Sequence, residues 1–290
     1  MKPAAQEMQV AWQPFTPKGI AAFARASVGR LLAVQLLMAF VAASTIAWFV
    51  QTAWCPIIAS AIAQLPDRGE IRRGQLDWPG PPNQTLAENR FLALTVDLEH
   101  AGQARSPAHV QFELGKRDVQ IRSLLGFARL PYWRHWTVPC NRVGLAPWWG
   151  AWRPPLVALL FAGVTVLLLL NWALLASVYF LPAWLVGLFS NRALGLLDSW
   201  RLSGAALIPG AALMSAAIVC YRWGMLELVG LMVAAALHIV VGLGYLLTAV
   251  LCLERHPAST PSQGNPFIAA TNGPAGTPMT DPQPKPPKPT

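Results

Sequence analysis

The residues best suited to chemistry in this chain are three polar side chains that follow an apolar stretch. Asp97, Glu99 and His100 form the tightest cluster of titratable groups between residues 51 and 153. Two acids at positions i and i+2 of a strand share a face, so a metal-binding or general acid–base role is one hypothesis for them. The alternative, which we favour, is the polar end of a strand that runs into a turn at Gly102.

Motifs of known catalytic or nucleotide-binding sites do not accompany this cluster. The sequence contains no G-x-x-x-x-G-K-[ST], G-x-G-x-x-G, H-E-x-x-H, C-x-x-C or G-x-S-x-G pattern. We therefore expect a protein that is not an enzyme and that uses no metal or cofactor. The net charge of +9 comes from Lys and Arg scattered over three polar regions. Because nucleic-acid binding requires clustered basic charge, we expect no nucleic-acid partner.

Composition indicates a membrane protein with several spans. Hydrophobic residues make up 54% of the 290 residues and charged residues only 12%, whereas soluble domains carry about 25% charged residues. A span needs about 20 mostly apolar residues. Four stretches meet this requirement and predict transmembrane helices at 31–50, 154–180, 202–221 and 226–253.

The remaining segments follow from this division. Residues 1–30 form an N-terminal segment, and residues 254–290 form a Pro-rich tail that we expect to be disordered and cytoplasmic. Residues 181–201 combine apolar residues with the polar Asn191, Arg192, Asp198 and Arg201, which favours a short amphipathic helix lying in the membrane interface. The alternative is that the second span continues with a kink at Pro182.

Two polar residues interrupt the predicted spans. Asn171 lies within the second span and His238 within the fourth. At 1.5 Å per residue, they lie about 22 Å and about 18 Å below the outer boundary, which permits a hydrogen bond between them. An intramembrane histidine suggests a proton or substrate path. The alternative is a neutral histidine that joins helices, and we favour it because no intramembrane acid accompanies it.

The loop at 51–153 predicts a small α+β domain. Residues 56–65 have helical spacing, and Val110–Leu114 and Val119–Arg122 alternate apolar and polar residues around a Gly-containing turn, as in a β-hairpin with one buried face. Cys55 and Cys140 lie near the two ends of this loop. A disulfide between them would stabilise the domain by about 4–5 kcal/mol, and two unpaired thiols are the alternative.

Tryptophans and arginines are interleaved towards the end of this loop. Such residues could bind an anionic saccharide or headgroup, but an interfacial collar that rests the domain on the bilayer is the simpler interpretation. The collar comprises Trp133, Arg134, Trp136, Trp148, Trp149, Trp152 and Arg153.

Flanking charges predict the orientation. Lys2, Lys18, Arg25 and Arg30 precede the first span, and Arg192 and Arg201 lie between the second and third. Short basic segments stay in the cytoplasm, so we expect both termini inside and residues 51–153 outside the bacterial inner membrane. Arg142 and Arg153, near the outer end of the second span, weigh towards the inverted topology, which remains the alternative.

The order of these parts resembles a known family. The carrying features are a helix at Pro56–Leu65, a Gly-Gln-Leu step at Gly74–Leu76, a strand ending in Val96-Asp97, a hairpin over His109–Leu124, and the segment Arg201–Pro209. Over roughly residues 15–253, the chain is similar to the bacterial membrane-protein family of unknown function often labelled maltodextrin utilisation protein. The resemblance implies an extracytoplasmic β-containing domain and a permease-like membrane part, with no catalytic residues.

These features predict a helical membrane protein with four transmembrane helices and an inserted α+β extracytoplasmic domain. We expect a non-enzymatic scaffold, sensor or transport-accessory subunit whose outer domain binds an envelope partner or saccharide. Its expected partners are the lipid bilayer and a membrane or envelope protein. The alternative is a small transporter component that uses the helices themselves.

Overall fold

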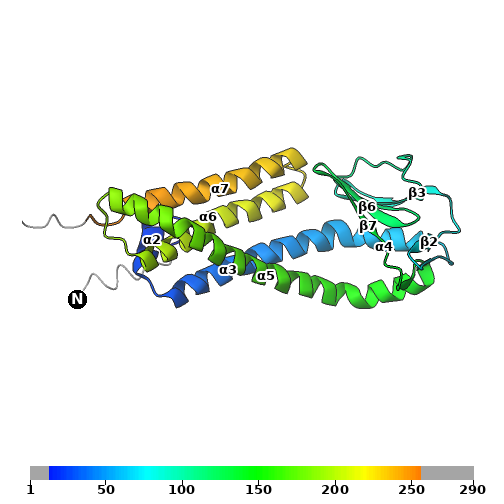
Figure 1. Cartoon of the computed structure of the whole chain (residues 1–290), viewed down its shortest axis with the longest axis horizontal. Coiled ribbons are helices and arrows are strands. Elements are labelled where there is room, and N and C mark those ends of the chain that lie inside the picture. Colours follow the sequence, from blue (N-terminus) through cyan, green and yellow to red (C-terminus); the bar gives the residue numbers. More distant parts are fainter. Residues whose placement is uncertain (1–12, 256–290) are drawn as a thin grey trace, which may run out of the picture.

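The computed structural model describes residues 13–255 and contains a helical bundle with a sheet domain at one end (Figure 1). The helices are α2 (Pro17–Ala22), α3 (Val28–Phe49), α4 (Cys55–Ala63), α5 (Arg142–Phe189), α6 (Leu196–Arg222) and α7 (Leu228–Leu251), with a 3-10 turn at Phe23–Arg25 and a π-helical segment at Val50–Trp54. The strands are β1 (Glu70–Arg72), β2 (Gln75–Asp77), β3 (Asn83–Glu88), β4 (Leu92–Asp97), β5 (Val110–Leu114), β6 (Asp118–Ser123), β7 (Gly126–Pro131) and β8 (Thr137–Pro139). The predicted combination of long apolar helices with an inserted β-containing domain is confirmed.

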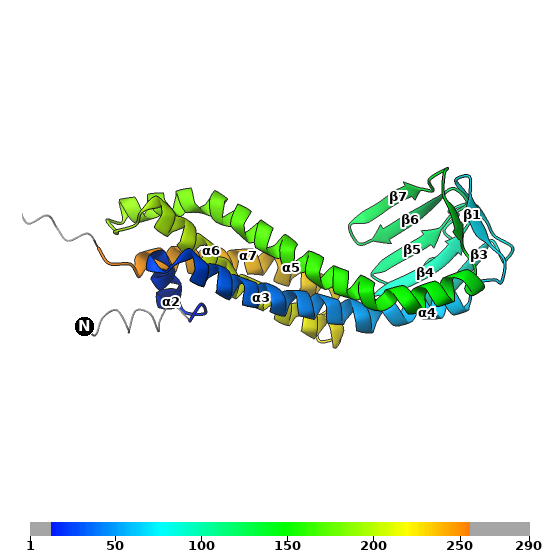
Figure 2. The ribbon, with the colours of Figure 1, turned by 90° about the horizontal axis from the view of Figure 1, so that it is seen from below.

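Four helical segments are long and apolar enough to cross a membrane, and each overlaps one predicted span. They are Val28–Ala63, Arg142–Phe189, Leu196–Arg222 and Leu228–Leu251. The first two contain 36 and 48 residues, or about 54 Å and about 72 Å of helix. Because about 20 residues suffice for a span, both continue past the bundle and carry the sheet domain (Figure 2).

The start of α5 differs from the prediction that Pro154 opens the second span. The Asn141 side chain accepts a hydrogen bond from Gly144 N at 2.8 Å and caps the helix there. Pro154 and Pro155 lie inside the helix, where each removes one backbone donor. The apolar run therefore located the membrane-like part of α5 but not its first turn.

The separate amphipathic helix predicted at 181–201 is absent. Residues up to Phe189 continue α5, Pro182 included, and Leu196 already begins α6. A turn at 190–195 joins the two helices, and Asn191 has a positive φ of 54°. The prediction failed because a change in polarity was interpreted as a change in secondary structure.

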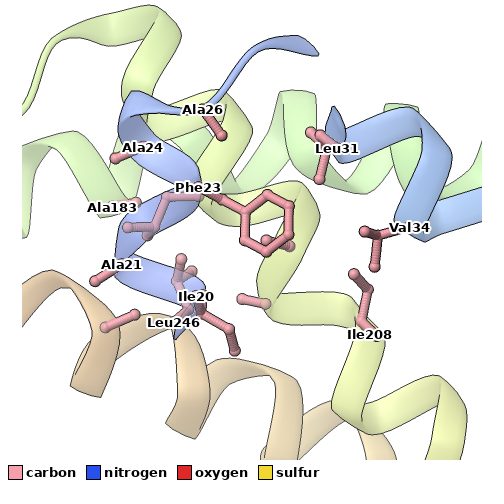
Figure 3. Packing of buried hydrophobic residues seen from close by; sticks show 14 of the residues in the cluster. Ile20, Ala21, Phe23, Ala24, Ala26, Leu31, Val34, Ala183, Ile208 and Leu246 are labelled. Carbon is pink, nitrogen blue, oxygen red and sulfur yellow. The ribbon is translucent and has the colours of Figure 1, made fainter. Parts of the chain in front are cut away.

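The bundle core lies at the end remote from the sheet domain. Ile20 and Phe23 are fully buried there, and they pack with Leu31, Ile208 and Leu246 from three long helices (Figure 3). Thr16 caps α2 and accepts from Gly19 N at 3.0 Å. The short helix α2 and the 3-10 turn after it therefore close this end of the bundle by packing apolar side chains against α6 and α7.

Both ends of the described chain lie at this same end of the bundle (Figure 1). The Arg25 guanidinium lies 2.8 Å from the Glu254 carboxylate, and Ala193 N donates to Glu254 O at 3.2 Å. Arg201 donates to Ala26 O. These contacts join the segment between α2 and α3, the α5–α6 turn and the segment after α7. Residues 256–290, most of the predicted tail, lie outside the described residues.

The sheet domain contains a five-stranded sheet in the order β3-β4-β5-β6-β7 and a small sheet in the order β2-β1-β8. All pairings are antiparallel except β4–β5, because residues 98–109 cross over between those two strands. The predicted hairpin is confirmed as β5–β6, with Phe112 opposite Ile121. A second apolar core lies between the sheet domain and α4. It includes Ala61, Leu65, Leu76, Val96 and Cys140.

The buried face of that hairpin is not the predicted one. The polar residues Gln111, Glu113 and Gln120 are buried, with Glu113 fully inaccessible, whereas Phe112 is only half-buried. The crossover at 98–109 lies against the polar face, since Gln111 donates to Ala104 O at 2.7 Å. Alternation located the strands, but a segment distant in sequence decided which face is covered.

Candidate functional site

The sheet domain meets the α6–α7 turn through a group of aromatic rings, which we call the junction. Phe91 after β3 and Tyr221 at the end of α6 are buried with ring centroids 5.0 Å apart. Phe49 of α3 lies 5.3 Å from Phe91, and His109 stacks on Tyr221 at 5.5 Å. Packed rings of this kind contribute about 0.5–1.5 kcal/mol per pair beyond their buried area.

Polar contacts fix the relative position of the two parts at the junction. The Arg90 guanidinium donates to Leu226 O at 2.7 Å and lies 5.7 Å from the centroid of the Tyr221 ring. His109 Nδ1 contacts the Tyr221 hydroxyl. Burial, and the positive charge of Arg90 with it, lower the pKa of His109 below its usual range. His109 is therefore a neutral hydrogen-bonding partner near pH 7.

The π-helical segment at Val50–Trp54 supplies acceptors to the same junction. Asn89 donates to Ala53 O at 2.7 Å, and Arg222 donates to Thr52 Oγ1 at 3.1 Å and to Thr52 O at 3.3 Å. A π-helical turn is rare and occurs frequently at functional sites. Here its carbonyl groups connect α3 to both the sheet domain and α6.

A second polar cluster lies within the sheet domain. The Glu113 carboxylate, fully buried on β5, contacts His100 Nδ1 and lies 3.2 Å from Arg122 Nε. His100 Nε2 lies 2.6 Å from the Asp118 carboxylate. Both ring nitrogens therefore face an acceptor, and only the doubly protonated imidazolium can donate to both.

The charge state of His100 follows from these contacts. Burial alone lowers the pKa of His100, but the hydrogen bonds and negative charges of Asp118 and Glu113 together outweigh it, so the pKa is raised. His100 also has a positive φ of 55°. The cluster holds the crossover loop against the β5–β6 hairpin and is structural in its geometry.

The predicted acid pair does not form a site. Asp97 is buried and accepts from the backbone N–H groups of Ala101 and Gly102 at 3.1 and 2.8 Å. Glu99 is exposed, and His100 turns instead to Glu113. Over residues 13–255, no group of three His, Cys, Asp or Glu side chains is arranged to hold a metal ion. Asp97 therefore stabilises the Gly102 turn, as the favoured alternative required.

The hydrogen bond that similar depth permits between Asn171 and His238 is not among the contacts of either side chain in the described residues. Asn171 is exposed on α5, and His238 Nδ1 contacts the carbonyl of Ala235 in its own helix. The polar contact between helices is made by Gln35 instead, which is buried on α3 and donates to Gly204 O of α6 at 3.1 Å. Depth along a helix was predicted, but the direction in which each side chain points was not.

The predicted collar is divided between two places. Trp133 and Trp136, whose ring centroids are 5.0 Å apart, lie with Arg134 on the connection between β7 and β8. Trp148 and Trp152 stack at 6.4 Å on α5. Trp149 is half-buried on α5, and Arg153 is exposed beside it. The seven residues therefore do not form one ring.

Cys55 and Cys140 are free thiols in the structure, and both are buried. Cys140 belongs to the apolar core on α4, where burial raises its pKa to about 11. Cys55 begins α4 and is not part of that core. The structure thus contains no bridge between them and corresponds to the alternative of two unpaired thiols.

In comparisons with known proteins, no family model, curated protein or solved structure matches this chain. The resemblance to the maltodextrin utilisation family stays a prediction. The junction residues were missed because Arg90, His109 and Tyr221 are isolated in sequence. One available signal was the aromatic Phe91 flanked by Arg90 at the start of an apolar strand.

Proposed function

We propose that the protein crosses the bacterial inner membrane four times and acts as a non-enzymatic scaffold, sensor or transport-accessory subunit. The sheet domain lies on the extracytoplasmic side and binds an envelope protein or saccharide. Both chain ends, with Arg25, Arg192 and Arg201 near them, lie in the cytoplasm. The basic residues at the bundle end that holds both ends of the described chain support this orientation.

The observation that carries the proposal is the junction. A domain that is merely tethered needs only a linker, but here Arg90, His109 and Tyr221 join the sheet domain to the α6–α7 turn. These direct contacts support a coupling between binding to the outer domain and the position of α6 and α7. Such coupling is what a sensor or accessory subunit requires.

Copurification from membranes provides the test. We expect the full-length protein to copurify with one membrane or envelope protein at a constant molar ratio. R90Q, which removes the contact to Leu226 O, should lower this ratio several-fold. R117Q removes an exposed arginine of the β5–β6 turn, far from the junction, and serves as the matched control. A monodisperse protein that copurifies with nothing and moves solute across liposomes by itself would instead establish the transporter alternative.

A further inference from the structure

A cavity of about 460 Å³ lies between the sheet domain and the start of α7. The crossover loop, β6 and α7 all contribute to its wall. Its polar and apolar lining includes Arg105, Ser106, His109, Arg122, Ser123 and Leu228. None of the described residues that line it is acidic. The cavity is therefore suited to an anion.

The two arginines of this cavity differ in availability. Arg122 pairs with the buried Glu113 carboxylate at 3.2 Å. Arg105 is exposed and has no ion-pair partner among residues 13–255. A guanidinium is geometrically matched to phosphate oxygens, which it can bind through two parallel hydrogen bonds. Arg105 is thus the group that would hold a phosphate.

The tip of the β6–β7 hairpin, next to the cavity, is apolar and exposed. Leu124 lines the cavity, and Leu124 and Leu125 of the turn and Phe127 of β7 are 61%, 83% and 67% exposed. This turn is the part of the five-stranded sheet that points back towards the bundle in both views (Figures 1 and 2). Trp223 and Met225, on the α6–α7 turn at that end of the bundle, are also exposed. Clustered apolar and aromatic side chains beside basic ones are typical of a membrane interface.

We propose that this cavity binds the phosphate of an anionic phospholipid of the outer leaflet. Arg105 pairs with the phosphate, and the apolar tip formed by Leu124, Leu125 and Phe127 enters the acyl-chain boundary. A lipid is favoured over a soluble phosphate because the apolar tip borders the cavity directly through Leu124. An anionic lipid is favoured over phosphatidylcholine, which also carries a phosphate, because the choline cation would lie beside Arg105 and Arg122 with no acidic residue in the lining to pair with it. The proposal rests on the membrane placement given under the proposed function.

Amide hydrogen exchange of the full-length protein in nanodiscs tests it. Nanodiscs of phosphatidylglycerol are compared with nanodiscs of phosphatidylcholine, and the readout is the exchange rate of the amides at 123–127. We expect exchange about tenfold slower in phosphatidylglycerol, as for a hydrogen bond to a charged group. R105Q should abolish this difference. R117Q, at the opposite end of β6, should leave it unchanged.

Three results would overturn the proposal: equal exchange in the two lipids, an undiminished difference in R105Q, or the same protection in phosphatidylcholine on addition of millimolar inorganic phosphate. Unchanged protection of the β4 and β5 amides shows that the R105Q variant is folded. If R105Q does not fold, the L125S variant serves as the test, because loss of the apolar side chain should reduce the lipid-dependent protection of residues 123–127. If the amides of α5–α7 are protected but exchange at 123–127 does not depend on the lipid, the lipid site is refuted and the membrane placement stands. Fast exchange throughout α5–α7 refutes the membrane placement itself.

Discussion

Replacing His100 by Asn should destabilise the β5–β6 hairpin and leave the helical bundle intact. Asn tolerates the left-handed backbone that His100 adopts, with φ of 55°. The substitution therefore tests the side-chain contacts rather than the backbone. It removes the imidazolium from the fully buried Glu113 and leaves Arg122 Nε at 3.2 Å as the remaining cation.

The expected magnitude follows from that arrangement. Losing one partner of a buried ion pair costs about 3–5 kcal/mol, and the retained Arg122 reduces this to about 2–3 kcal/mol. Amide exchange of β5 and β6 in the full-length protein should therefore accelerate about 30-fold to 150-fold. R73N is the matched control, because Arg73 also has a positive φ, of 51°, in the same domain but is exposed. It should be neutral.

The destabilisation caused by H100N should depend on pH, and the structure gives the sign of this dependence. The pKa of His100 is raised in the folded state, so its contribution is complete below the unfolded value of about 6.5 and is lost as pH rises through the folded pKa. The difference between wild type and H100N should be largest near pH 6 and shrink towards pH 9. A difference that grows with pH, or an H100N exchange rate equal to that of R73N, would refute the reasoning.

Three further expectations concern the helices and the thiols. G210A places a Cβ 2.5 Å from an α7 backbone carbonyl oxygen and should destabilise the bundle in detergent by about 1–3 kcal/mol. G244A is the control: its Cβ would have nothing within 4 Å, so it should be neutral or stabilising by up to about 1 kcal/mol. Equal melting temperatures of the two variants would contradict the α6–α7 packing. Q35L removes the buried donor to α6 and should lower the unfolding free energy by about 1 kcal/mol; an unchanged value would mean that the contact is absent. Cys140, buried and with its pKa raised to about 11, should react with maleimide far more slowly than the exposed Cys252, without prior reduction; labelling of Cys140 only after reduction would instead indicate a disulfide.

Much of the architecture was predictable from local patterns. Apolar runs located all four long helices, and period-two alternation located β5 and β6 with their turn. These features depend on the length of an apolar run and on the spacing of apolar residues, which can be read directly from the sequence. The helix ends were less predictable, since the Asn141 cap and the π-helical segment at Val50–Trp54 extend two helices past their apolar runs.

The composition and the spacing of apolar residues by themselves determined that the chain has four long apolar helices with an inserted β-containing domain, and the order of these parts. The tertiary structure decided everything that depends on direction: which nitrogen of His100 meets which carboxylate, that Gln35 rather than His238 joins two helices, and that Arg90 and Tyr221 meet at the junction. The physical reason is that these partners are separated by many residues along the chain. Their contact depends on how helices and strands are rotated against one another, and no local pattern encodes that rotation.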